Sequence, residues 1–240
     1  YHFTYPQTKR PSLRNIAWQI EAGKTYGIVG KTGSGKTTLV RQLLQQYPVG
    51  RGIFQINGKS VSHYSRPSIE AMIGYVPQEH ILFSKSVKDN IAFGKRNATL
   101  SDIEKAIKTA AFSEDLKRMP DGLETLIGER GVSISGGQKQ RVSLARAFIR
   151  QPEVLILDDS LSAVDAQTER RIIKNLQDMR ANQTTIIVTH RLSAIQQADW
   201  VLVLEDGQIV EEGTPNQLLN KGGWYAEQYQ RQQHQKGGSK

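Results

Sequence analysis

The chain has 240 residues, with 32 Lys and Arg against 23 Asp and Glu and no cysteine. This composition is typical of a globular protein with one large domain or two small ones, and it excludes disulfides and thiolate metal sites. No apolar run reaches the roughly 20 residues that span a bilayer. The net charge of +9 would suit nucleic acid or an acidic membrane surface. Because the basic residues are scattered without interleaved aromatic residues, we expect no nucleic-acid partner.

Strands and helices alternate along most of the chain. Continuous β-branched and aliphatic runs predict strands that are covered on both faces, as in a parallel sheet between helices. This alternation predicts an α/β fold with a mostly parallel sheet. The predicted strands are residues 25–30, 154–159, 184–190 and 200–213, and the predicted helices are residues 36–47, 138–150 and 166–180.

Two segments near the N-terminus predict a different kind of sheet. The first 25 residues and residues 52–60 are typical of strands, and the second segment contains the turn signal Asn57-Gly58. We therefore expect an N-terminal antiparallel β layer.

The middle of the chain predicts helices. Residues 81–135 contain no convincing strand, and residues 101–119 have helical periodicity. We expect an inserted α-helical subdomain at about residues 81–150, within a single domain that spans residues 1–235. The Gln-rich stretch before the C-terminus predicts a frayed helix or disorder, and residues 236–240 predict a flexible tail.

Residues 30–37, GKTGSGKT, fit the pattern G-x-x-x-x-G-K-[ST] between a predicted strand and a predicted helix. Glycines here let successive backbone N–H groups converge on an anion, and the helix N-terminus adds favourable partial charge. Lys36 can reach the β and γ phosphates, and Thr37 offers a hydroxyl to Mg²⁺. A Gly-rich turn that merely carries a lysine is the alternative. The predicted nucleotide-binding residues are Gly30, Lys31, Thr32, Gly33, Ser34, Gly35, Lys36, Thr37 and Thr38.

Two carboxylates, Asp158 and Asp159, follow an apolar run. Ligands of open parallel sheets collect at the carboxyl ends of the strands, so Asp158 is placed to bind the Mg²⁺ that Thr37 also contacts. Asp159 is then placed to approach the attacking water. The alternative for Asp158 is a cap on the helix that follows.

A second candidate anion site precedes the helix predicted at residues 138–150. Ser135, Gly136 and Gly137 lie just before Gln138, at a helix N-terminus whose N–H groups can hold phosphate. One nucleotide does not need two such ends from distant parts of one chain, whereas a head-to-tail dimer uses both. Simple helix capping is the alternative.

Together these motifs resemble the nucleotide-binding domain of ATP-binding cassette (ABC) transporters, over nearly the whole chain. ISGGQ at residues 134–138 is similar to the LSGGQ signature, and VLILDDS at residues 154–160 is similar to the second acidic motif. The resemblance implies a P-loop NTPase core of the RecA type, with ATP and Mg²⁺ as its ligands. It also implies a second nucleotide-binding domain as partner, whose nucleotide is contacted by Ser135, Gly136, Gly137 and Gln138.

Four further positions match the family pattern. Gln78 matches the Q-loop residue. The resemblance implies that this residue contacts Mg²⁺ and the membrane domain. His190 matches the switch histidine, and a neutral imidazole there can donate a hydrogen bond to charge that develops at the γ-phosphate. Asp165 matches the D-loop acid at the dimer interface, and Tyr5 matches the aromatic residue that stacks on adenine. Taken singly, such residues are more often surface or packing residues. The implied catalytic residues are Asp159, His190 and Gln78.

Two stretches resemble the exporter branch of the family. They are residues 82–94 and residues 125–138, the second of which is similar to the loop that contacts the membrane domain. Leu126 departs from this pattern, because exporters usually have Glu there. The resemblance implies a domain at the cytoplasmic face of the cell membrane, in a polypeptide whose membrane helices lie upstream of Tyr1.

Asp159 is a second departure, because the residue after the metal-binding Asp is usually Glu in this family. Losing one methylene retracts the carboxylate by roughly 1 Å, and a misplacement of that order can cost about 10²-fold in rate. DDSLSAVD at residues 158–165 is similar to the degenerate-site half of heterodimeric bacterial multidrug-type exporters. This predicts a slow site that mainly holds ATP, in a dimer with a different chain.

Two alternative functions remain open from the sequence. A regulatory ATP-binding module without turnover is favoured by Asp159. A non-transport ABC ATPase that acts on nucleic acid is favoured by the net charge of +9, and the exporter-like stretches oppose it.

Overall fold

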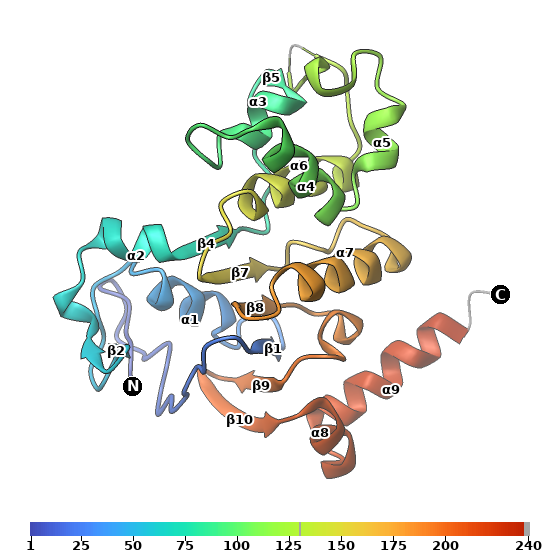
Figure 1. Ribbon diagram of the computed structural model, residues 1–240. Coiled ribbons are helices and arrows are strands. Elements are labelled where there is room, and N and C mark those ends of the chain that lie inside the picture. The colour runs from blue at the N-terminus through green and yellow to red at the C-terminus, as the bar shows by residue number, and fades with distance from the viewer. Residues whose placement is uncertain (130, 238–240) are drawn as a thin grey trace.

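A computed structural model of the chain describes residues 1–129 and 131–237 and has a six-stranded sheet at its centre (Figure 1). The strand order is β10-β9-β1-β8-β7-β4. All neighbouring pairs are parallel except β9 and β10, which form an antiparallel hairpin at one edge. The strands are β1 (Thr25–Gly30), β4 (Ile73–Val76), β7 (Val154–Asp158), β8 (Thr184–Val188), β9 (Trp200–Glu205) and β10 (Gln208–Gly213).

Both faces of the sheet are buried, as predicted. Because side chains alternate along a strand, Val29 of β1 packs in one hydrophobic cluster and Ile28 in another. In β7, Leu155 and Leu157 likewise belong to the first cluster and Ile156 to the second. The predicted α/β fold with a mostly parallel sheet is confirmed.

Helices cover the sheet on both sides (Figure 1). Two of them lie beside the strand ends that carry the predicted site: α1 follows β1 directly, and α7 connects β7 to β8. The helices are α1 (Lys36–Leu43), α2 (Arg66–Met72), α3 (Val87–Ala92), α4 (Leu100–Thr109), α5 (Ser113–Lys117), α6 (Gly136–Phe148), α7 (Ala166–Met179), α8 (Pro215–Lys221) and α9 (Trp224–Gly237).

The helices α3 to α6 gather at one end of the molecule, at the top of Figure 1. Their apolar faces meet around fully buried side chains, among them Ile91, Ile103 and Phe112. This arrangement agrees with the expected helical insertion. The segment also holds one short ladder that the sequence did not predict, between β5 (Lys85–Ser86) and β6 (Leu126–Ile127).

The N-terminal antiparallel layer is smaller than expected. It consists of isolated antiparallel bridges between Phe3 and Leu13 and between His2 and Arg51, and of a hairpin of β2 (Gln55–Ile56) and β3 (Lys59–Ser60). The predicted Asn57-Gly58 turn connects this hairpin, and both residues have positive φ, at 51° and 74°. Such values are typical of the type I′ turn, whose twist matches that of the two strands.

The C-terminal stretch is helical. α9 reaches Gly237, and its residue Tyr225 is 1% exposed. Residues 238–240 of the expected tail lie outside the described residues. Within residues 1–129 and 131–237, no helix is both long enough and apolar enough to cross a membrane.

Candidate functional site

The loop between β1 and α1 has the backbone that a phosphate cradle needs. Gly30 has a φ of 150°, and a Cβ there would lie 2.2 Å from the carbonyl oxygen of Leu204. Gly33 has a φ of 82°, which side-chain-bearing residues rarely adopt. The sequence therefore needs glycine at Gly30 for close packing against β9 and at Gly33 for the turn itself.

Lys36 lies over this loop and is only 7% exposed. Its Nζ donates to the carbonyl oxygens of Gly30 and Lys31, at 2.8 and 2.9 Å, and to Oγ of Ser34 at 3.4 Å. Burial lowers the pKa of Lys36, and the nearby carboxylates of Asp158 and Asp159 oppose this shift. The ammonium group is thus held by the loop, and it lies close enough to the acid pair for their charges to interact.

A cleft of about 400 Å³ opens at the N-terminus of α1. Besides the loop, its wall contains Arg10, Ser12 and Asp206, which the sequence analysis did not single out. These residues come from segments without a motif, so no sequence signal marked them. The lining residues are Thr8, Arg10, Pro11, Ser12, Gly33, Gly35, Lys36, Thr37, Thr38, Asp206 and Gly207.

Tyr5 lies beside this cleft but does not line it. Phe3 and Tyr47 pack edge-on against its ring, each with centroids 4.9 Å away. Its hydroxyl donates to Oγ1 of Thr38 at 3.1 Å and accepts a hydrogen bond from Arg41 at 3.4 Å. The side chain is therefore anchored to α1, and its role in stacking on adenine stays a prediction.

Asp158 ends β7 and is 7% exposed. The hydroxyl of Tyr75, on the neighbouring strand β4, donates to its Oδ2 at 3.1 Å. Burial raises the pKa of Asp158, and the hydrogen bond from Tyr75 opposes this shift. Asp158 does not cap the next helix, because Asp165 is the residue at that position.

Asp159 has a left-handed backbone, with a φ of 48°. Its N–H donates to the carbonyl oxygen of Val188 at 2.8 Å, which ties the residue to the end of β8. Burial raises the pKa of Asp159, and the neighbouring side chains of His190 and Arg191 oppose this shift. The parallel register of β1, β8 and β7 thus brings Lys36, the acid pair and His190 to the edge of the sheet that is formed by the carboxyl ends of its parallel strands.

The donor set at this edge fits Mg²⁺. Asp158 offers a carboxylate, Thr37 a hydroxyl and Gln78 an amide oxygen, and Mg²⁺ prefers oxygen ligands. Thr37 and Gln78 are both exposed. Among the described residues no group of three or more His, Cys, Asp and Glu is placed to hold a metal. A Mg²⁺ ion here therefore needs water and phosphate oxygens as its other ligands.

The ISGGQ residues span the N-terminus of α6, in the helical end of the molecule, with Ser135 as the residue that precedes the helix. Ser135 and Gln138 make a capping box, in which Oγ of Ser135 accepts from N of Gln138 at 3.2 Å and Oε1 of Gln138 accepts from N of Ser135 at 2.9 Å. The capping alternative is thus present in the structure. Gly136 and Gly137 begin the helix itself, and neither they nor Ser135 and Gln138 line the cleft at the N-terminus of α1.

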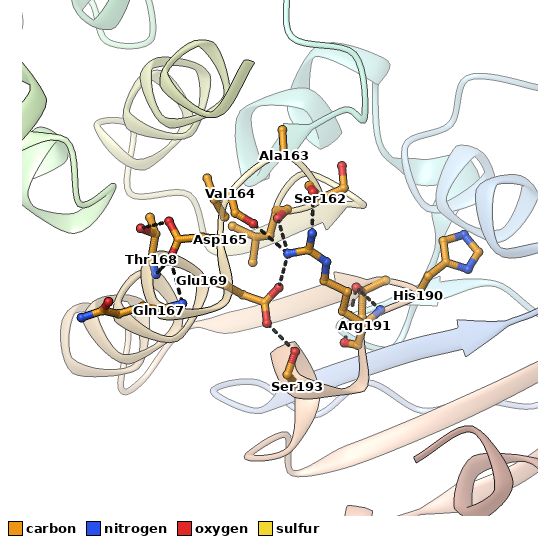
Figure 2. Close-up of polar contacts among 12 residues, drawn as sticks. Ser162, Ala163, Val164, Asp165, Gln167, Thr168, Glu169, His190, Arg191 and Ser193 are labelled. Carbon is orange, nitrogen blue, oxygen red and sulfur yellow. Dashed lines mark hydrogen bonds and ion pairs between the residues drawn. The ribbon is translucent and has the colours of Figure 1, made fainter. Parts of the chain in front are cut away.

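Asp165 caps the N-terminus of α7. Its Oδ1 accepts from the backbone N–H groups of Gln167 and Thr168, both at 2.9 Å, and its Oδ2 accepts from the Thr168 hydroxyl at 2.7 Å (Figure 2). These bonds lower the pKa of Asp165 to about 2. The residue has a structural role within the chain, and its role at a dimer interface stays a prediction.

His190 follows β8 and is exposed. Figure 2 shows its ring directed away from the polar cluster around Glu169 and Arg191. We call residues 189–193 the switch segment and residues 160–165 the D-loop. The side chain of Arg191 connects these two segments, a contact that the sequence analysis missed.

Comparisons with known proteins agree with these observations. The profile of the family described as ABC transporter matches residues 13–162. A probable multidrug resistance ABC transporter ATP-binding/permease protein, YheI of Bacillus subtilis (strain 168), is 53% identical over 96% of this chain and 40% of its own length. The multidrug resistance-like ATP-binding protein MdlA of Escherichia coli (strain K12) is 41% identical over 97% of this chain and 40% of its own length.

A solved structure is also similar. The chain matches a bacterial Atm1-family ABC exporter with ATP bound, with a TM-score of 0.91 and 37% identity over 96% of this chain and 41% of that one. The chain thus spans about two fifths of the length of these relatives. It therefore belongs to the ABC transporter family, as an ATP-binding domain of the kind that hydrolyses ATP.

Proposed function

We propose that this domain powers export of a substrate across a membrane, through ATP-driven closure of a head-to-tail dimer at the cytoplasmic face. The observation that supports ATP hydrolysis most directly is the meeting of Lys36, Asp158, Asp159 and His190 at the carboxyl edge of the sheet. Lys36 and the loop before α1 supply cationic and N–H donors for phosphate, and the acid pair supplies carboxylates for metal and water.

Each of these residues has a separate role in ATP binding and hydrolysis. The loop from Gly30 to Thr38 and the ammonium of Lys36 bind the phosphates, and Thr37, Asp158 and Gln78 supply ligands to Mg²⁺. Bound Mg²⁺ neutralises charge on the phosphates. Asp159 orients the attacking water and accepts its proton, and His190 donates a hydrogen bond toward the γ-phosphate.

A second nucleotide-binding domain completes the site. Ser135, Gly136, Gly137 and Gln138 do not line this chain's own cleft, which supports their use on a partner's nucleotide. The side chain of Gln138 is fixed for this by Asp115, whose Oδ1 accepts from its Nε2 at 3.0 Å. Asp165 would face the partner at the same interface.

A groove of about 600 Å³ between β4 and the helical end supports a membrane domain as the other partner. Three large apolar side chains on it are exposed, with Phe93 at 71%, Ile81 at 68% and Phe83 at 37%. Exposed apolar side chains that gather in a groove mark interaction sites. We propose that a membrane domain of the same polypeptide contacts this groove.

We propose that this site hydrolyses ATP slowly and that its partner in the dimer is a different chain. Asp159 supports this, because its carboxylate is one methylene shorter than that of the Glu usual at this position. Its left-handed backbone also agrees, since Asp adopts that conformation more readily than Glu. The partner would then carry Glu after its own metal-binding Asp, and this chain's ISGGQ would complete the faster site.

ATP affinity and single-turnover hydrolysis, measured separately on this chain in a dimer-forming context, test the proposal. We expect tight Mg²⁺-dependent ATP binding with slow but measurable hydrolysis. Hydrolysis as fast as that of Glu-containing relatives would contradict the slow site. ATP binding with no hydrolysis at all, even after Asp159→Glu, would favour a regulatory module without turnover, the second candidate that Asp159 supports.

A further inference from the structure

Arg191 occupies a position between the two segments that carry His190 and Asp165. Its Nη1 donates to the carbonyl oxygens of Val164 at 2.8 Å and Leu161 at 3.4 Å, and its Nη2 donates to that of Ser162 at 2.7 Å (Figure 2). One guanidinium of the switch segment therefore satisfies three carbonyl groups of the D-loop.

The same guanidinium is fixed from the other side by Glu169 of α7. Oε2 of Glu169 lies 3.1 Å from Nη1 of Arg191, and Oε1 accepts from the hydroxyl of Ser193 at 2.5 Å. The side chain of Glu169 is only 1% exposed, whereas that of Arg191 is 40% exposed. A buried carboxylate needs a charged or hydrogen-bonded partner, so Glu169 holds Arg191 and Ser193 in one arrangement.

Each of the two segments has a further support of its own. The D-loop is held by Gln140 of α6, whose Oε1 accepts from N of Ala163 at 3.0 Å. The switch segment is held by Gln232 of α9, whose Nε2 donates to the carbonyl oxygen of His190 at 2.8 Å. Oε1 of the same amide accepts from N of Leu192 at 3.0 Å.

We propose that Arg191 is a positioning residue that makes the switch segment and the D-loop move as one unit, so that a shift of His190 at the γ-phosphate is transmitted to Asp165 and to the start of α6. This rests on the proposed function, because it assumes that His190 acts at this chain's nucleotide and that the D-loop and ISGGQ face a partner's. It gives a physical route by which one site senses the state of the other.

The geometry requires arginine. A lysine places one ammonium group at the end of its chain and cannot donate in a fork to Val164, Ser162 and Glu169 together. The variant Arg191→Lys keeps the charge beside buried Glu169 and removes the connection to the D-loop. Arg170, exposed on the same helix as Glu169, provides the control Arg170→Ala.

Hydrogen exchange of the 240-residue chain tests the mechanical connection without any turnover. Gln232→Glu removes the amide donor to the carbonyl oxygen of His190, so its direct effect is on the switch segment. With Arg191 present, we expect faster exchange in residues 189–193 and also in residues 160–165. With Arg191→Lys, we expect Gln232→Glu to affect residues 189–193 only. Gln233→Glu adds the same charge at an exposed neighbouring position and should change neither segment.

Single-turnover hydrolysis and ATP affinity test the consequence for the reaction. We expect Arg191→Lys and Glu169→Gln each to slow hydrolysis roughly 10-fold to 100-fold with unchanged ATP affinity. The double variant should be no slower than the slower single variant, because both changes break one connection. Thermal unfolding measured in parallel identifies any variant that has lost its fold.

The outcomes separate this proposal from the proposed function. Effects of Gln232→Glu that stay within residues 189–193 while Arg191 is present would overturn the connection, as would additive effects of the two single variants on hydrolysis. If His190→Ala leaves hydrolysis unchanged, the role of His190 fails, while the exchange experiment still decides whether Arg191 joins the two segments.

Discussion

The hydroxyl of Tyr75 donates a hydrogen bond of 3.1 Å to Oδ2 of Asp158, across the parallel pair β4 and β7. The predicted Mg²⁺ ligand is thereby oriented by a neighbouring strand, and its Oδ1 has no such contact with Tyr75. Partners of this kind fix the direction of a metal-binding carboxylate, and their loss typically costs about 10-fold to 100-fold in metal affinity.

Tyr75→Phe should therefore weaken Mg²⁺ binding about 10-fold and leave metal-free ATP binding unchanged. The measurement is the Mg²⁺ concentration that half-saturates ATP binding. Tyr64→Phe is the matched control, because its hydroxyl donates to the carbonyl oxygen of Ile56, away from the site. Equal effects of the two variants would contradict a specific role for Tyr75.

The sequence located the strands that build this edge but not every strand. Continuous apolar runs identified β1, β7 and β8, because strands buried on both faces contain little except apolar side chains. Residues 200–213 were predicted as one strand, whereas the structure divides them into β9 and the partly exposed β10, which carries Glu211 and Glu212. β4 has only four residues and includes Gly74, whose Cβ would lie 2.5 Å from the Pro152 side chain. A strand this short, with a glycine that close packing requires, gives too weak an apolar pattern to be predicted from the sequence.

The site shows the same limit. Motif residues at strand ends were predicted because their chemistry requires particular side chains. Arg191 was not, because three of its acceptors are backbone carbonyl oxygens, and these carry no signal in a sequence. The contact between Gln232 and His190 joins residues 42 positions apart, and it depends on how α9 packs rather than on any local pattern.

Asp159→Glu should raise single-turnover hydrolysis roughly 10-fold to 100-fold, because the longer carboxylate reaches the attacking water. ATP affinity should not change. The variant should also be less stable by up to about 1 kcal/mol, since the left-handed backbone at position 159 suits Asp better than Glu. Asp159→Asn, which keeps the shape without the charge, is the control and should lower hydrolysis further. Unchanged hydrolysis in Asp159→Glu would show that carboxylate length is not what limits this site.

Asp165 should make the domain sensitive to acid. Hydrogen bonds in the folded chain lower its pKa from 3.8 to about 2. A lowered pKa means that the ionised group stabilises the fold fully above pH 3.8, and that this contribution is lost as the pH falls toward 2. Asn also caps helices well but does not titrate. The stability advantage of the wild type over Asp165→Asn should therefore shrink across this pH range.

The comparison with alanine isolates the cap. Asp165→Ala should cost about 1 kcal/mol near neutral pH, because it removes the acceptor for Gln167 and Thr168. Urea unfolding of the three chains at several pH values provides the measurement. A difference between wild type and Asp165→Asn that stays constant below pH 3.8 would contradict the assigned cause of the shift. If Asp165→Asn keeps its stability but loses ATP-dependent dimer formation, the charge itself acts at the interface.

Lys36→Met should weaken ATP binding without changing the fold of the loop at residues 30–37. Charge-assisted hydrogen bonds are worth about 1.5 to 3 kcal/mol, so ATP affinity should fall by at least roughly 10-fold. Methionine retains the length of the buried stem, which keeps the packing under the loop. Isothermal titration with ATP gives the affinity, and Lys59→Met, at an exposed position outside the loop, is the control. Similar losses in both variants would mean that the loop responds to total charge rather than to the ammonium of Lys36.

The stability of Lys36→Met has a pH dependence that can be predicted in sign. Burial lowers the pKa of Lys36 below 10.5, so the folded chain releases this proton more readily than the unfolded chain. The wild type therefore gains stability relative to Lys36→Met as the pH rises through the lowered pKa toward 10.5. Thermal unfolding of the two chains in parallel cancels the titration of other groups. A difference that moves the opposite way would show that the attraction to Asp158 and Asp159 outweighs the burial of the ammonium group.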